Sequence, residues 1–178
     1  MNDRLTAIST HLLFFTLEMN RIHGDVMARQ MADPTLAHWA PFIRVLHMFR
    51  PYQLSDEVES VLHEKSVTGA AAWNRLFDET MASLRVPLAG EELPLGAALD
   101  RMSSPDRMAR ADAARAVGAT LQERIRLFSL VANTLAKDKA ITDTLRHYPR
   151  PTSARNCANM VEDGVVDALV QAVTASYP

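Results

Sequence analysis

His63 and Glu64 are the residues of this chain that most resemble part of a catalytic motif. A His-Glu-x-x-His sequence on a helix places two histidines on one face, where they share a zinc ion, and the glutamate handles protons for the metal-bound water. The residue four positions after His63 is Val67, which has no lone pair to offer a metal. The sequence therefore has the first half of a zinc motif without its second histidine.

Two carboxylate–histidine pairs have the four-residue spacing that places side chains on one helical face: Glu59 with His63, and Asp143 with His147. Isolated pairs of this kind are usually solvated contacts worth little free energy, and we favour that interpretation over a catalytic one. No glutamate has a histidine three positions later, so the Glu-x-x-His pairs of a di-iron bundle are missing. Cys157 could be a nucleophile, but a lone cysteine beside a helix is more often a small buried hydrophobic residue.

The segment 148–156, Tyr-Pro-Arg-Pro-Thr-Ser-Ala-Arg-Asn, is the strongest candidate for a binding site. Its prolines restrict the backbone, and its arginines can meet a carboxylate or peptide carbonyl groups. The candidate residues for substrate contact are Tyr148, Arg150, Arg155 and Asn156. The alternative, which we favour because exposed arginines are common, is that both arginines pair with acids at a domain junction or lie solvated on a loop.

Apolar residues three and four positions apart predict the helices that must position these groups. The spacing predicts one helix over 5–26 and another over 73–84. Between them, Asp33 before Pro34 resembles an N-cap followed by a proline at the first helical position. We therefore expect a helix to begin there, with a kink at Pro41.

Capping signals predict two further helix starts. Ser55 and Asp56 can cap a helix in which Glu59 closes a capping box on Asp56. The serine–proline pair at 104–105 repeats the cap-plus-proline signal, and helical spacing then continues to Leu135. His63 falls late in the first of these two helices.

Turn-forming residues between short apolar runs predict a small β-hairpin near 84–95, with Ala89 and Gly90 as its turn. The prolines at 149 and 151 break the chain, and a final helix is expected over 161–173. We find no internal repeat and no low-complexity linker. The expected fold is therefore all-α, an irregular multi-helix bundle with that one hairpin.

The composition is that of one globular domain. The chain has 178 residues, 48% hydrophobic and 22% charged, and its nineteen basic residues are interleaved with twenty-one acids. A net charge of -2 argues against a nucleic-acid partner. The most apolar run, Leu12 to Phe15, has only four residues, far below the roughly 20 residues of a membrane span. With one cysteine and no signal peptide visible, we expect a cytoplasmic protein without membrane or nucleic-acid partners.

Several stretches, taken in order, resemble the N-terminal half of oligoendopeptidase F-type zinc metallopeptidases. They are LLFFTLEMNRI, RPYQLSDEVE, LHEKSVTG, WNRLFDETM, VANTLAKDK and YPRPTSARNCANMVEDGVVDALV. Together they extend over nearly the whole chain, and long runs in the right order are more specific than any single motif above. In that family the catalytic half comes later in the chain and supplies His-Glu-x-x-His and a further glutamate as zinc ligands. The helical N-terminal half forms one wall of a deep peptide channel.

The resemblance implies that residues 1–178 are the channel-wall part of such a peptidase and that the catalytic zinc domain is absent from this sequence. We expect no catalytic residue, no metal ligand and no cofactor in this chain, and zinc in the full-length parent, which would hydrolyse short peptides. The chain alone would then not be an enzyme. Its partners would be the parent's own catalytic domain and short peptides.

Two other functions are open from the sequence. The chain could be a stand-alone helical domain that shares ancestry with the peptidase and uses its groove only to bind peptides or proteins. A weaker alternative is a purely structural helical dimer. The first helix is apolar beyond one stripe at Leu12 to Leu17, and an uncovered patch of this kind can meet its own copy across a two-fold axis. We therefore expect the isolated chain to self-associate as a symmetric homodimer.

Overall fold

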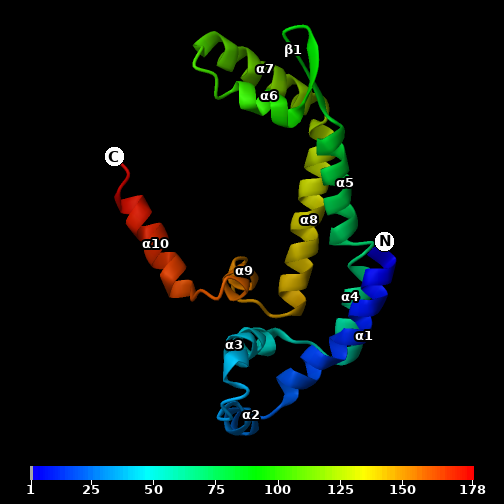
Figure 1. The fold of residues 1–178 in the computed structure, drawn as a ribbon, viewed down its shortest axis with the longest axis vertical. Coiled ribbons are helices and arrows are strands. Elements are labelled where there is room, and N and C mark those ends of the chain that lie inside the picture. The colour runs from blue at the N-terminus through cyan, green and yellow to red at the C-terminus, as the bar shows by residue number, and fades with distance from the viewer. Residues whose placement is uncertain (1) are drawn as a thin grey trace. The chain divides into compact units, whose positions relative to one another are not determined.

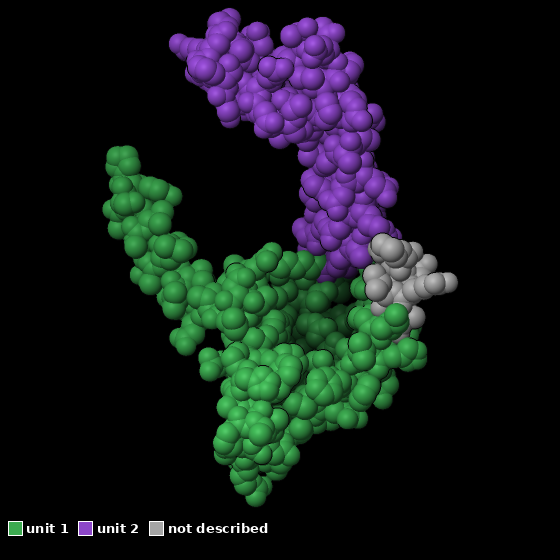
Figure 2. Space-filling view, in the orientation of Figure 1, with its two compact units in different colours: residues 1–67, 139–178 green, residues 68–138 purple. Residues whose placement is uncertain are grey.

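The computed structural model of the chain describes residues 2–178, with side chains from residue 8 onward. Helices make up most of the described chain, and its one sheet is a small two-stranded hairpin, so the all-α class is confirmed (Figure 1). We expected the helices to pack as one bundle. The chain instead divides into two compact units, residues 1–67 with 139–178 and residues 68–138 (Figure 2).

The first unit is built from both ends of the chain. Its elements are α1 (Asn2–Arg21), α2 (Gly24–Met31), η1 (Ala37–Trp39), α3 (Ala40–Phe49), η2 (Arg50–Tyr52), α4 (Asp56–Lys65), the end of α8 (Ile125–Leu145), α9 (Ser153–Ala158) and α10 (Asp163–Ala175). Within it, α1 packs beside α4 and α3, and α3 also contacts α9. Leu17, Met27 and Ile43 are its buried apolar residues.

The helix predicted over 5–26 is two helices, because His23 interrupts it. His23 has an extended backbone (φ -61°, ψ 140°), and its carbonyl accepts hydrogen bonds from the backbone N–H groups of Val26 and Met27. His23 is therefore the N-cap of α2, although its side chain makes no capping bond. The stripe of apolar residues continues across this break, which is why spacing alone did not reveal it.

The cap predicted at Asp33 does not start a helix. The Asp33 carboxylate accepts hydrogen bonds from the backbone N–H and the hydroxyl of Thr35, at 2.8 and 2.7 Å, and so closes a tight turn. The helix α3 begins only at Ala40, with Pro41 in its first turn. A proline there lacks only an N–H that has no helical partner, so Pro41 starts the helix and does not kink it.

The second unit has a core of its own. Its elements are α5 (Ala70–Ser83), β1 (Arg85–Leu88), β2 (Glu91–Pro94), α6 (Leu95–Arg101), α7 (Arg107–Glu123) and the first part of α8. Val86, Ala98 and Val117, from β1, α6 and α7, form its buried centre, and four partly buried hydrophobic residues pack around them. A separate core explains why these residues form a unit by themselves.

The helix predicted from residue 104 to residue 135 is also two helices. Asp106, not Ser104, is its N-cap, since the Asp106 carboxylate accepts from the backbone N–H of Met108 at 2.8 Å. The first part ends at Glu123, and the second begins at Ile125 after Arg124 leaves helical geometry (φ -105°, ψ 8°). The cap-plus-proline pattern located this start to within three residues.

The hairpin predicted near 84–95 is confirmed, with Leu88 paired to Glu91 across a two-residue loop. Both loop residues have positive φ angles, 54° at Ala89 and 84° at Gly90, as a type I′ turn requires. Glycine adopts this conformation without strain, whereas the Cβ atom of alanine makes it unfavourable. Ala89 is therefore a locally unfavourable residue in the turn.

We expect Ala89→Asn to raise the free energy of unfolding by about 0.5–1 kcal/mol, because Asn-Gly is the preferred pair for this turn and asparagine tolerates positive φ. Urea unfolding followed by circular dichroism measures the change. Ala111→Asn, an exposed position inside α7, is the matched control and should lower stability, since asparagine is a poorer helix former than alanine. A loss of stability in Ala89→Asn would contradict the turn assignment.

Candidate functional site

His63 is not placed as a zinc ligand. It lies in the last turn of α4, and its Nε2 atom is 2.7 Å from the hydroxyl of Ser9 on α1. No group of three or more His, Cys, Asp or Glu side chains that could hold a metal occurs among the described residues. With valine at position 67, the surroundings of His63 do not fit a zinc ion.

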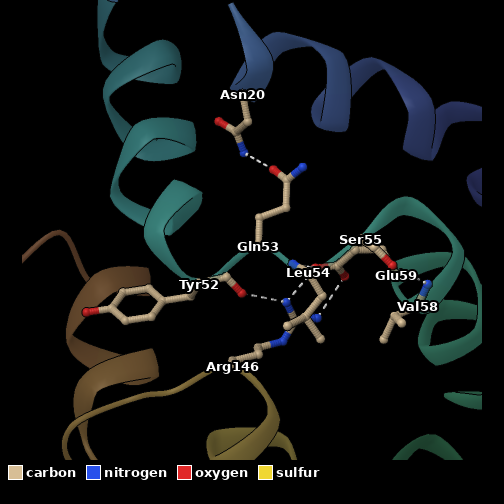
Figure 3. A network of polar contacts seen from close by, with 8 residues as sticks. All are labelled: Asn20, Tyr52, Gln53, Leu54, Ser55, Val58, Glu59 and Arg146. Carbon is tan, nitrogen blue, oxygen red and sulfur yellow. Dashed lines mark hydrogen bonds and ion pairs between the residues drawn. The ribbon is translucent and has the colours of Figure 1, made fainter.

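An ion pair between Glu59 and Arg146 is the central polar contact of the first unit (Figure 3). Two parallel hydrogen bonds of 2.7 and 2.8 Å join the guanidinium to the two carboxylate oxygens. The same carboxylate accepts from the backbone N–H of Leu54 at 3.0 Å, and Arg146 also donates to the carbonyl of Tyr52 at 3.1 Å. The pair therefore ties α4 and η2 to the end of α8.

The environment keeps both partners of this pair charged. Burial opposes ionisation of Glu59, but hydrogen bonds from Arg146 and Leu54 outweigh it and hold the pKa of Glu59 below its usual 4.5. The hydrogen bonds to Glu59 likewise raise the pKa of Arg146. Glu59 thus bonds Leu54 and Arg146, and the capping box that we predicted between Glu59 and Asp56 is wrong.

Tyr148 stacks against Tyr52 at the same place, with ring centroids 4.2 Å apart. The chain reaches Tyr148 through a turn in which His147 has a positive φ of 58° and the backbone N–H of Tyr148 bonds the carbonyl of Asp143 at 2.9 Å. This is a Schellman end to α8, so Asp143 and His147 do not share a helical face. Burial raises the pKa of Tyr148, which is neutral at physiological pH.

A pocket of about 320 Å³ lies beside these residues, and we name it the Asn20 pocket. It is lined by Leu13, Thr16, Leu17, Asn20, Phe49, Tyr52, Gln53, Glu59, Arg146 and Tyr148. The Asn20 side chain is buried, and its Nδ2 donates to Gln53 Oε1 at 2.8 Å (Figure 3). Its Oδ1 has no hydrogen-bond partner among the described residues.

The other residues predicted from the segment 148–156 lie elsewhere in the first unit. Arg150 makes two hydrogen bonds to Asp167 of α10, at 2.9 and 2.8 Å. Asn156 is buried and donates to Asp163, also of α10, at 2.6 Å. Arg150 thus joins the α8–α9 connection to α10, and Asn156 joins α9 to α10. Arg150 pairs with an acid, as in the alternative that we favoured, but within one unit and not at a domain junction.

Arg155 and Cys157 lie on α9. Arg155 is exposed, and its guanidinium makes no hydrogen bond or ion pair with the residues that the structure describes. Cys157 is a half-buried free thiol, and burial raises its pKa, which disfavours the reactive thiolate. Of the four residues that we predicted for substrate contact, Tyr148 lines the Asn20 pocket and Arg155 is available to solvent.

Apolar side chains are exposed on two helices of the first unit. On α1 they are Ile8, Leu12, Phe14 and Phe15, and on α10 they are Val165, Leu169, Val170 and Val173. Leu12, Phe14 and Phe15 lie within the patch expected at Leu12 to Leu17, whereas Leu17 at its end is buried. Among the described residues, no helix has the length and apolar content that a membrane span requires.

Residues 18–85 match the family model for oligopeptidase F. The match supports an N-terminal region of the oligoendopeptidase F type over these residues. The match confirms the resemblance over residues 18–85, and within this oligopeptidase F region lie Asn20, Tyr52, Gln53 and Glu59 of the Asn20 pocket. No curated protein and no solved structure matches the chain.

We expect Arg146→Met to lower the free energy of unfolding by about 2 kcal/mol. Breaking a fully buried ion pair costs about 3–5 kcal/mol, and the cost is smaller here because Arg146 and Glu59 are partly exposed. Arg155→Met is the control, since that arginine is exposed and unpaired, and it should change little. Urea unfolding at pH 7 measures both variants.

The same pair predicts the acid response. Because the folded pKa of Glu59 is lowered, its contribution is fully present above the unfolded value near 4.5 and is lost as pH falls through the folded value. Wild type should therefore lose stability below pH 4.5 more steeply than Arg146→Met, in which burial favours the protonated carboxyl. Parallel acid profiles for the two proteins would contradict this account of the pair.

Proposed function

We propose that this chain is the non-catalytic substrate-channel part of a zinc metallo-oligoendopeptidase that hydrolyses short peptides, and that its first unit contributes a peptide-binding surface. One observation carries the proposal: the region matching oligopeptidase F supplies much of the Asn20 pocket. The described side chains offer hydrogen bonds, aromatic rings and apolar walls, which suit binding. Zinc and its ligands would come from the parent's catalytic domain, so this chain would not cleave peptides.

The exposed apolar faces of α1 and α10 support the proposal that a neighbouring domain packs against this chain. Soluble monomers seldom expose large contiguous apolar surface, and Leu12 and Leu169 are both more than half exposed, at 61% and 64%. In the intact peptidase these faces would pack against the catalytic domain. Covering them would remove apolar surface from water, which is the main source of favourable free energy in such contacts.

A second candidate is a stand-alone peptide-binding or protein-binding domain of the same ancestry. Every residue that lines the Asn20 pocket belongs to the first unit, residues 1–67 and 139–178. A pocket formed by one unit alone favours this second candidate. The reading frame distinguishes the two. A His-Glu-x-x-His sequence downstream of this segment would support the peptidase, and a stop codon without one would support the binding domain.

We expect the chain to bind a fluorescein-labelled nine-residue peptide of mixed sequence, with a saturable rise in fluorescence anisotropy. Arg155→Ala should weaken binding several-fold, because its exposed, unpaired guanidinium is available to peptide carbonyl groups. Arg150→Ala should have a smaller effect, since Asp167 already holds that guanidinium. In the intact peptidase the same changes should reduce turnover and leave the zinc content unchanged.

The dye without a peptide is the control for this titration. Binding that does not saturate at millimolar protein, or that equals binding of the dye alone, would contradict a peptide-binding role for the chain.

We expect the isolated chain to self-associate through α1, where Leu12, Phe14 and Phe15 are exposed, and to sediment as a dimer whose population rises with concentration. Leu12→Glu should shift it to a monomer. Met108→Glu, which changes an equally exposed apolar residue of the second unit, is the matched control and should leave the dimer intact. If the wild-type chain is monomeric throughout the micromolar range, the exposed apolar residues of α1 do not drive self-association, and this prediction is wrong.

A further inference from the structure

We propose that the Asn20 pocket is a subsite for one uncharged, apolar residue of a peptide, with a peptide N–H donating a hydrogen bond to Asn20 Oδ1. The inference rests on the proposed function and adds to it the place and the chemistry of one contact. Three features of the pocket carry it: an acceptor without a donor, charges that are already paired, and walls that are apolar and aromatic.

The unpaired acceptor comes from a side chain that is only 6% exposed. Asn20 Nδ2 is used by Gln53 Oε1, and Figure 3 shows the Asn20 oxygen on the side away from Gln53. Buried polar atoms in folded proteins nearly always have a hydrogen-bond partner, and an acceptor without one costs free energy. A ligand that brings an N–H donor to Asn20 Oδ1 recovers that free energy. Asn20 lines the pocket, but Oδ1 itself has almost no exposed surface, so the amide must turn toward the pocket for a ligand to reach it.

The paired charges exclude a charged ligand group. The two carboxylate oxygens of Glu59 accept from Arg146 and Leu54, and both terminal nitrogens of Arg146 donate to Glu59. Neither side chain is left to neutralise an incoming charge. An acidic or basic side chain would lose its hydration in the pocket without gaining a partner, so binding would be unfavourable.

The walls favour an apolar side chain. Leu13, Leu17 and Phe49 line the pocket together with the stacked rings of Tyr52 and Tyr148. The volume of about 320 Å³ is at the lower end of ligand sites, which range over roughly 300–1,000 Å³. The pocket thus suits a single residue, and the rest of a peptide would lie outside it.

The test uses the whole chain labelled with ¹⁵N and four small probes. The first is N-acetyl-phenylalanine methylamide, which has an aromatic side chain and two N–H donors. The second and third replace phenylalanine by glutamate and by lysine. In the fourth, an acetoxy group replaces the acetamido group and a dimethylamide replaces the methylamide, so the side chain is kept and both donors are removed.

We expect the phenylalanine probe to bind with a millimolar dissociation constant and to shift the NMR signals of the Asn20 side-chain amide and the Tyr148 backbone. The charged probes and the donor-free probe should each bind at least tenfold more weakly. Equal affinity for the phenylalanine and donor-free probes would overturn the hydrogen bond to Asn20. Equal affinity for the charged probes, or shifts confined to residues outside the pocket, would overturn the subsite.

Asn20→Leu separates a contact with the ligand from a structural role. Leucine has the same number of side-chain heavy atoms as asparagine and the same branching at Cγ. The variant should lose affinity for the phenylalanine probe at least tenfold while binding the donor-free probe as the wild type does. If Asn20 had only a structural role, Asn20→Leu would weaken the binding of both probes equally, and that result would overturn the proposal. If this variant does not fold, the comparison of the two probes on the wild-type chain decides the question.

The outcomes also separate this inference from the proposed function. The nine-residue peptide could bind while all four probes bind with equal affinity. In that case the subsite proposal is wrong, but the proposal that the chain binds peptides remains supported. If neither the nine-residue peptide nor any probe binds, the proposed function itself fails, and the subsite fails with it.

Discussion

The ion pair between Glu59 and Arg146 is the contact on which the first unit depends. It joins residues 87 positions apart, one from each of the two segments that make up the unit. The guanidinium bonds the carbonyl of Tyr52, and the carboxylate bonds the N–H of Leu54, so the pair also fixes the backbone between η2 and α4. That backbone carries Tyr52 against Tyr148 and Gln53 against Asn20. The bidentate salt bridge thus helps to position Tyr52, Gln53 and Tyr148, which form one side of the Asn20 pocket.

A chain that leaves the first unit at residue 67 and returns at residue 139 needs such a long-range contact. The intervening residues pack on their own centre at Val86, Ala98 and Val117, which gives them a source of stability separate from the first unit. Closing a loop of this length costs conformational entropy that grows only slowly with length. A few well-formed contacts between residues 1–67 and 139–178 are therefore enough to hold the first unit together.

The sequence predicted the kinds of element better than their ends, and local contacts better than distant ones. Helical spacing and the Ala89–Gly90 turn predicted the all-α class and the hairpin, because both signals lie within a few residues. The breaks at His23 and Arg124 depend on the backbone angles of single residues, which spacing does not report. Tyr148 was predicted for the candidate site. Glu59 and Arg146 were not identified as a pair, because contacts between residues so far apart have no local signature.

The paired state of the charges also limits what this chain can contribute to peptide binding. Arg146 is held by Glu59 and Arg150 by Asp167, so neither guanidinium is free to clamp a substrate carboxylate. Hydrogen bonds and apolar contacts of one residue with one pocket give modest affinity, because ordering a flexible peptide opposes them. Modest affinity would suit the proposed channel wall, since tight binding of substrate and product alike would slow release without accelerating cleavage. Under the proposed function, these residues would orient a peptide, and the chemistry would take place on another domain.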